Sequence, residues 1–151
     1  GMNVCLGTDG TASNNNLDLF EEIKAAALLA KEKHRDPTAV SATAALMMAT
    51  DCGARAQGRD TECGMIKEGM DADLILVDFT RPHLMPCHNV ISSLAYSARG
   101  GDVCLTMVRG KVLYAGGKFP TIDLSAVVKE LAEYAMPKVF QPTGSDESSA
   151  S

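Results

Sequence analysis

A carboxylate that directly follows an apolar run is the first candidate for chemistry in this sequence. Asp9 comes after the run Val-Cys-Leu at positions 4–6 and lies between Gly7 and Gly10, so the pattern predicts a buried strand that ends in a tight turn. Active sites of parallel-strand barrels lie at the carboxyl ends of the strands, and the glycines leave room for a ligand. From the residues alone, an aspartate here is more typical of a turn that bonds its own backbone.

Histidine and cysteine come close together once, in the segment 81–88, which contains His83, Cys87 and His88. Two prolines hold this segment extended and no second ligand pair follows, so we interpret it as a loop rather than a zinc site. The five cysteines form an odd set without a Cys-x-x-Cys pair, which predicts no disulfide framework. We expect most of them to be buried thiols in a reducing compartment.

Polar residues next to the Asp9 turn have two possible roles. The asparagines at 14–16 could contact a substrate, but asparagine also caps helices and tolerates left-handed backbone, and we favour capping and loop bracing.

Two further acidic residues lie much later in the chain. Asp71 and Asp73 lie in a turn and at a strand start, and we expect a structural role for both.

The elements that must position these residues follow from periodicity and caps. Helical spacing predicts helices at 17–34, capped by Asn15 or Asp18, and at 41–57, capped by Ser41 with a weak point at Gly53. A third helix is expected at 89–98. A last helix should begin near Asp123 and end at Pro137.

Two strand pairs are expected between these helices. Alternation and turn residues predict that 64–66 pairs with 73–78, across the turn 68–71. Strands at 103–108 and 111–115 flank Arg109-Gly110, a two-residue hairpin signal. The polar tail 142–151 is expected to be disordered.

Composition excludes several classes of partner. The chain has 151 residues and a net charge of −5, which argues against a surface that follows nucleic-acid phosphates. No stretch approaches the ~20 apolar residues that cross a bilayer, and the first residues lack the basic and apolar regions from which we would expect a signal peptide. We expect a cytoplasmic protein that binds neither nucleic acid nor membrane.

Several segments together resemble one known family. The first are Gly-Thr-Asp-Gly at 7–10 and Ser-Asn-Asn-Asn-Leu-Asp at 13–18; later ones are 36–39, 49–50, 53–56, 69–75, 82–84 and 108–112, in the same order. They resemble the methylthioadenosine and S-adenosylhomocysteine deaminase branch of the amidohydrolase superfamily over about residues 1–120. Thr11 and Cys52 depart from the expected pattern without an obvious effect on chemistry.

The resemblance implies a fold and a role for Asp9. The implied class is α/β: the C-terminal part of a metal-dependent hydrolase TIM barrel, with its last strand and helix, plus segments of a small β-sandwich domain. It implies four regions: the barrel end at 1–57, β-rich segments with one helix at 58–120, a C-terminal helix at 121–141 and the tail 142–151. In this family the aspartate that matches Asp9 binds a divalent metal, zinc or iron, touches the substrate and acts in catalysis.

The remaining family machinery, its metal-binding histidines and catalytic glutamate, would precede Gly1. Because a catalytic zinc needs three or four protein ligands, we expect the isolated chain to be inactive and to hold no metal tightly. The resemblance implies that the full-length protein deaminates an adenosine-type nucleoside by a metal-activated water, or, as an alternative, acts on a heterocyclic amine such as a triazine, and is a homo-oligomer. A third hypothesis is a non-catalytic assembly module.

Overall fold

The computed structural model describes residues 1–140, which divide into a first compact unit, 1–117, and a second that begins at Lys118. The helices and strands of the first unit are α1 (Leu19–His34), α2 (Ala42–Ala49), α3 (Asp51–Ala56), β1 (Leu74–Val77), η1 (Pro82–Leu84), α4 (Val90–Tyr96), η2 (Gly100–Asp102), β2 (Val103–Val108) and β3 (Lys111–Ala115). Those of the second unit are α5 (Leu124–Glu130), the π-helical turn η3 (Leu131–Ala135) and α6 (Met136–Val139). The predicted disorder of 142–151 falls outside the described residues.

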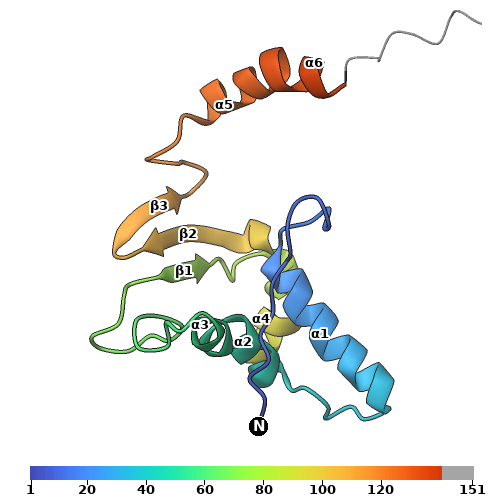
Figure 1. Ribbon diagram of the computed structural model, residues 1–151. Coiled ribbons are helices and arrows are strands. Elements are labelled where there is room, and N and C mark those ends of the chain that lie inside the picture. The colour runs from blue at the N-terminus through green and yellow to red at the C-terminus, as the bar shows by residue number, and fades with distance from the viewer. Residues whose placement is uncertain (141–151) are drawn as a thin grey trace, which may run out of the picture. The chain divides into compact units, whose positions relative to one another are not determined.

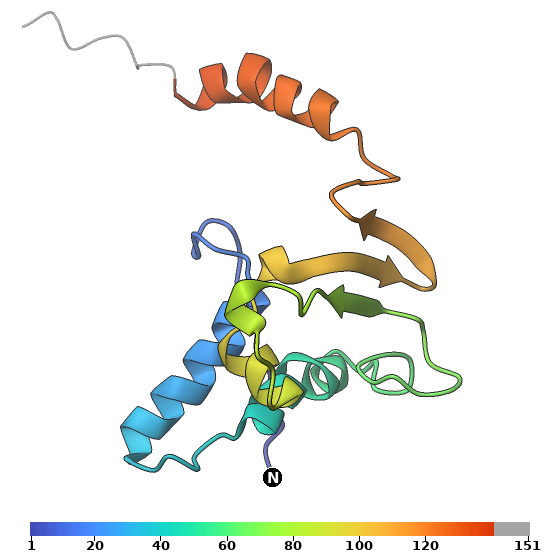
Figure 2. The ribbon, with the colours of Figure 1, turned by 180° about the vertical axis from the view of Figure 1, so that it is seen from behind.

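The core of the first unit lies where α1, α2 and α4 pack side by side (Figures 1 and 2). Three of its four buried side chains are small: Ala27 of α1, Ala45 of α2 and Ala95 of α4 surround Ile23 of α1. Small side chains let helix axes approach closely, but they remove little apolar area from water. The helices are therefore close-packed around a small core.

Side-chain caps begin the helices where the sequence predicts. Asp18 accepts a hydrogen bond from the Phe20 N–H at 2.9 Å, and Ser41 and Asn89 cap α2 and α4 in the same way. The predicted helix 41–57 divides at Thr50 rather than weakening at Gly53. The Thr50 hydroxyl donates to the Leu46 carbonyl four residues back, a bond that bends helices.

The sheet is antiparallel in the order β1-β2-β3. The predicted hairpin between β2 and β3 is confirmed: Arg109 and Gly110 both have positive φ, 47° and 75°, as a two-residue hairpin turn requires. The predicted pairing of 64–66 with 73–78 is wrong, because β1 pairs with β2 instead. The backbone of Gly64 packs on α3, where an added Cβ would lie 2.7 Å from the Ala54 Cβ.

The expected buried strand at 4–6 is also absent. The Leu6 N–H donates to the Met48 carbonyl at 3.0 Å, whereas Val4 is half exposed and Cys5 is exposed. A strand of a parallel sheet is defined by neighbours on both edges. None of the described strands lies beside residues 4–6. The segment is held by its backbone bond to α2 and by Leu6, which packs against the core of the three helices.

In the second unit, Asp123 caps α5 as predicted, with the Ala126 N–H bonded to its carboxylate. The helix was predicted to end at Pro137, but it continues to Val139. Proline lacks an N–H and its ring clashes with the carbonyl four residues earlier. The π-helical turn η3 ends two residues before Pro137 and widens the backbone spacing there, which makes room for the ring.

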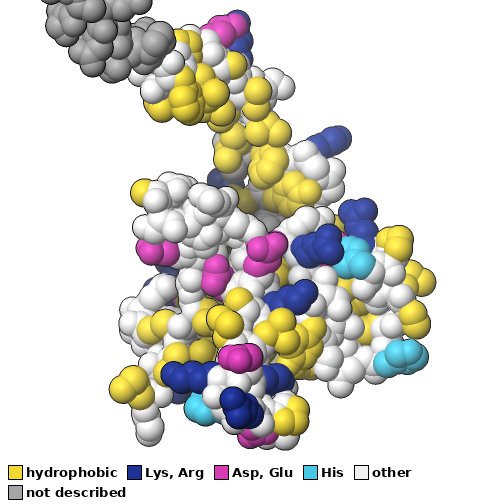
Figure 3. All heavy atoms as spheres, turned by 90° about the vertical axis from the view of Figure 1, so that its right-hand side faces the viewer, with side chains coloured by type: hydrophobic (Ala, Val, Ile, Leu, Met, Phe, Trp, Pro, Cys, Tyr) yellow, Lys and Arg dark blue, Asp and Glu magenta, His cyan; other side chains and the backbone are white. Residues whose placement is uncertain are grey.

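Many large apolar side chains stay at the surface of the described chain, as the face in Figure 3 shows. Ile66 is 90% exposed and Leu29 is 67% exposed. Exposed apolar area on this scale is typical of surfaces that other segments or partners cover. Among the described residues, no helix has the length and hydropathy needed to cross a membrane.

Candidate functional site

Asp9 lies in the exposed loop before α1 and adopts a left-handed backbone with φ of 59°. Its Oδ1 accepts a hydrogen bond from the Gly10 N–H at 2.8 Å, and the Gly10 carbonyl accepts from the N–H groups of Ser13 and Asn14. No described residue donates a hydrogen bond to Asp9 Oδ2. The aspartate therefore bonds its own turn through one oxygen and leaves the second oxygen accessible.

Asparagines brace this loop, as predicted. The Asn14 amide donates to the Thr8 carbonyl at 2.9 Å and to Glu22 of α1 at 3.0 Å. Its Oδ1 accepts from the Asn16 N–H, and Asn16 Oδ1 accepts from the Asp18 N–H. The loop thus contains successive links in which a side-chain oxygen accepts from the backbone N–H two residues later.

Asp18 extends this series to a distant part of the chain. While its Oδ1 caps α1, its Oδ2 accepts a hydrogen bond of 2.7 Å from the Gly100 N–H, 82 residues away. A Cβ on Gly100 would lie 3.2 Å from the Asp18 carboxylate, so glycine permits the close approach. The cap was predicted from the sequence. The contact between Asp18 and Gly100 was not, because it joins distant residues and produces no periodic pattern in the sequence.

His83 contacts a carboxylate rather than the nearby Cys87 and His88. Its Nε2 lies 2.8 Å from Oδ2 of Asp102, a buried residue that also accepts from the Arg99 N–H. Burial raises the pKa of the Asp102 carboxyl, but the hydrogen bonds from His83 and Arg99 outweigh burial and the pKa is lower than usual. This pair fastens η1 to η2, and Asp102 was not singled out in the sequence.

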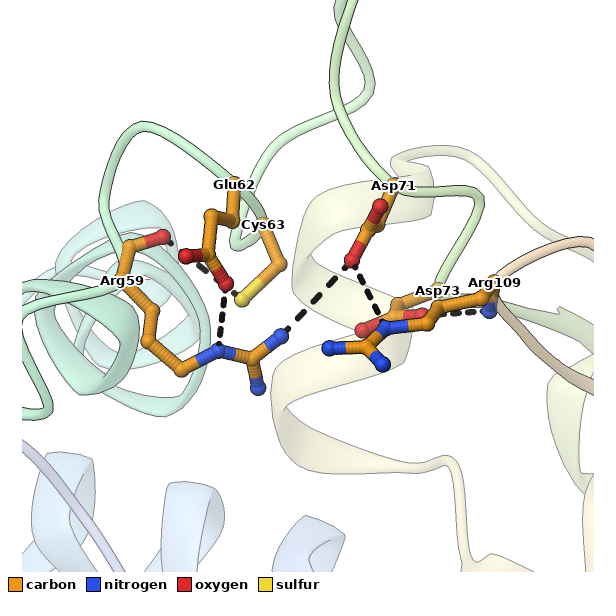
Figure 4. Close-up of polar contacts among 6 residues, drawn as sticks. All are labelled: Arg59, Glu62, Cys63, Asp71, Asp73 and Arg109. Atoms are coloured by element: carbon orange, nitrogen blue, oxygen red, sulfur yellow. Dashed lines mark hydrogen bonds and ion pairs between the residues drawn. The ribbon is translucent and has the colours of Figure 1, made fainter.

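The predicted structural roles of Asp71 and Asp73 are confirmed. Figure 4 shows the guanidinium groups of Arg59 and Arg109 on either side of Asp71, at 3.8 and 3.2 Å from its Oδ2. Asp73 accepts from the Arg109 N–H at 2.7 Å, and Arg59 also pairs with Glu62. These contacts connect the segment 57–73 to the β2–β3 turn.

The cysteines differ in part from the prediction. All five are free thiols, as expected, but Cys5 and Cys87 are exposed and the other three are only partly buried. Full burial of a thiol requires packed layers on every side. Residues 4–6 and the loop before α4 are not covered in this way by the described chain.

Within residues 1–140, no three histidine, cysteine or acidic side chains come together as a metal site would require. Asp9 offers one hard oxygen donor, which fits a single ligand position on a divalent cation but does not complete a zinc site. A hollow of about 660 Å³ lies elsewhere, beside α1 and α4, with Lys24, His83, Tyr96 and Arg99 in its lining. Asp9 does not line this hollow.

Known proteins resemble this chain over most of its length. Residues 1–113 match the model of the amidohydrolase family. A 5'-deoxyadenosine deaminase of Methanosarcina mazei is 53% identical over 89% of this chain and 31% of its own length. A 5-methylthioadenosine/S-adenosylhomocysteine deaminase of Moorella thermoacetica is 50% identical over 88% of this chain and 31% of its own length.

Solved structures agree with the sequence relatives. A zinc-bound adenosine deaminase from Xanthomonas campestris superposes with a TM-score of 0.85 at 38% identity, over 89% of this chain and 30% of that one. An atrazine chlorohydrolase from Arthrobacter aurescens with zinc superposes with a TM-score of 0.73 at 26% identity, over 87% of this chain and 29% of that one. The chain therefore spans about 30% of the length of these proteins. With a family match that covers most of its residues, this chain belongs to the amidohydrolase family.

Proposed function

We propose that this chain is the C-terminal part of a metal-dependent deaminase of adenosine-type nucleosides, and that Asp9 is a metal ligand in it. The observation that carries the proposal is the 50–53% identity with deaminases of 5'-deoxyadenosine, 5-methylthioadenosine and S-adenosylhomocysteine. The free Oδ2 of Asp9 supports the assignment, since a ligand oxygen must be accessible to the cation. The other ligands would come from residues outside this chain.

The proposed fold follows from the same relationship. Residues 4–6 would be the last strand of the barrel and α1 its last helix, within a barrel end at 1–57. Residues 58–120 would belong to the small β-rich domain, followed by a C-terminal helix at 121–141. In the full-length protein, a neighbouring strand that the described chain lacks would lie beside residues 4–6. The segment would then be an extended strand with one face on α2.

The chemistry assigned to Asp9 is coordination and proton transfer. A divalent zinc or iron ion, when bound, would lower the pKa of a coordinated water. Asp9 would hold the cation through Oδ2, while the Gly10 N–H fixes Oδ1. A carboxylate in this position can accept a proton and pass it to the departing ammonia.

The test replaces Asp9 in the full-length protein. Asp9→Asn removes the charge but keeps the size and the Oδ1 acceptor, so ammonia release from methylthioadenosine or S-adenosylhomocysteine should fall by about a hundredfold or more, with loss of bound zinc. Asp60→Asn is the matched control, because Asp60 is exposed and makes no hydrogen bond or ion pair with the described residues. Full activity and zinc content in Asp9→Asn would refute the proposal.

A triazine or related hydrolase is the second candidate, which the superposition with atrazine chlorohydrolase supports. The zinc-bound adenosine deaminase superposes better and with higher identity, so we rank nucleosides first. Measuring kcat/KM of the full-length protein for S-adenosylhomocysteine and for a chlorotriazine decides between them. A larger value for the triazine would reverse the ranking.

The exposed apolar side chains also support a role of the isolated chain in assembly. The 151-residue chain should then associate at high concentration, because its uncovered apolar surface is too large for a stable monomer. Light scattering measures the mass directly. A monomer at millimolar concentration would contradict this role, and ammonia release by the isolated chain would contradict the expectation that it is inactive.

A further inference from the structure

We propose that Asn14 is a positioning residue for Asp9, acting through the peptide bond that joins Thr8 to Asp9. This inference rests on the proposed metal-ligand role of Asp9.

The orientation of the Asn14 amide is determined by its partners. Thr8 O and Glu22 Oε1 can only accept hydrogen bonds, so the NH₂ group must face both of them. The Asn16 N–H can only donate, so Oδ1 must face it. Because each of the three contacts requires this one orientation, a flipped amide would lose all of them.

The contact with Thr8 O acts directly on the backbone of Asp9. That carbonyl belongs to the peptide plane before Asp9, so holding it limits rotation about the Asp9 φ angle. Asp9 has a φ of 59°, a left-handed value that is uncommon outside glycine, although aspartate adopts it more readily than most residues. Asn14 therefore helps to maintain the backbone conformation from which the Asp9 carboxylate emerges.

The contact with Glu22 supplies the fixed reference. Glu22 belongs to the first turns of α1, and the next residue, Ile23, is buried in the core. Asn14 is partly buried between this helix and the loop, while its neighbour Asn15 is exposed and makes no hydrogen bond within the described residues. The two asparagines thus form a natural pair of test and control positions.

The experiment uses the full-length protein and two isosteric substitutions. Asn14→Asp keeps the shape but loses both donors and places a carboxylate beside Glu22. We expect kcat to fall by about tenfold to a hundredfold, as for a small displacement of a catalytic group, with KM changed less and zinc released faster to a chelator. Asn15→Asp introduces the same charge one residue away and should change each quantity by less than about twofold.

A second substitution separates positioning from stability. In Asn14→Asp/Glu22→Gln, the glutamine amide can donate to the new carboxylate, which restores the link to α1 but not the bond to Thr8 O. We expect the unfolding midpoint to recover while kcat and zinc release remain impaired. Recovery of kcat together with stability would overturn the inference, since Asn14 would then act only through the fold.

Asn14→Ala provides the same test if the charged variant does not fold, because it adds no charge beside Glu22. An unchanged kcat and zinc release rate in Asn14→Ala would overturn the inference. Asp9→Asn distinguishes the two proposals. If Asp9→Asn stays active, the proposed function fails; if it is inactive while both Asn14 variants behave as wild type, only the positioning role fails.

Discussion

Two segments without helix or strand, the loop 7–18 and the segment 57–73, are held in place by different forces. In the loop, short polar side chains bond backbone N–H groups and carbonyls of nearby residues. In 57–73, long charged side chains pair across a largely exposed surface (Figure 4), and Gly64 packs against α3. Short hydrogen bonds to the backbone define geometry within narrow limits, whereas exposed ion pairs are weak and screened by salt.

The largest expected effect tests close packing in 57–73. Gly64→Ala would place a Cβ 2.7 Å from the Ala54 Cβ and 3.2 Å from the Asp51 Cα, at a φ of 96°. We expect a loss of about 2–4 kcal/mol in the free energy of unfolding, from overpacking and backbone strain, measured by urea denaturation. Gly69→Ala is the control, because its φ is 85° but its Cβ would meet open space. Equal losses in both variants would mean that contact with α3 is unimportant.

The second prediction concerns the distant anchor of the loop. Asp18→Ala removes the cap on Phe20 and the bond to Gly100, and should cost about 2 kcal/mol. Asp18→Asn keeps an oxygen for the cap but presents an NH₂ to the Gly100 N–H, so it should cost less while still loosening η2. Hydrogen exchange of the Gly100 amide reports the difference. Protection of that amide in Asp18→Asn equal to wild type would show that the contact contributes nothing.

The third prediction concerns pH. Because the pKa of Asp102 is lowered from 3.8 in the folded protein, its contribution to stability is present above pH 3.8 and is lost as the pH falls through the lower folded value. His83→Ala removes a hydrogen bond that lowers this pKa and should cost about 1 kcal/mol at neutral pH. The difference from wild type should shrink below pH 4 in urea denaturation. A difference that grows as the pH falls below 4 would contradict the assigned pair.

The smallest expected effect tests the ion pairs. Asp71→Asn weakens the contacts with Arg59 and Arg109 and should cost about 0.5 kcal/mol at low salt and less at 1 M NaCl. Asn16→Ala in the loop should cost about 1 kcal/mol at either salt concentration. Urea denaturation at two salt concentrations compares them. The contrast between the two segments fails if Asn16→Ala depends on salt as strongly as Asp71→Asn.

Local features of the sequence predicted local structure well. Asp18 and Ser41 cap the next helix by contacts within three residues, as expected, and Arg109-Gly110 determines its own hairpin. The pairing of β1 with β2 was missed because residues that lie far apart in the chain decide it. The absent strand at 4–6 has the same cause, since a strand depends on neighbours.

In the candidate site, too, local contacts could be predicted from the sequence and long-range contacts could not. The position of Asp9 after an apolar run and its turn were readable from residues 4–10, and bracing by the asparagines was readable from their type. The contact of Asp18 with Gly100 and that of His83 with Asp102 join distant segments without any repeating pattern. The metal role of Asp9 depends on groups outside the described chain, so it remains a proposal.

The links from Asn14 to Asn16, from Asn16 to Asp18 and from Asp18 to Phe20 each step forward by two residues. Deleting or inserting a single residue within one of these links would separate its side-chain oxygen from its N–H partner, and would shift the residues before it relative to α1. The intervening side chains at 15 and 17 are exposed and take no part in these links. Saturation mutagenesis should therefore find this stretch permissive at alternate positions yet intolerant of any change in length.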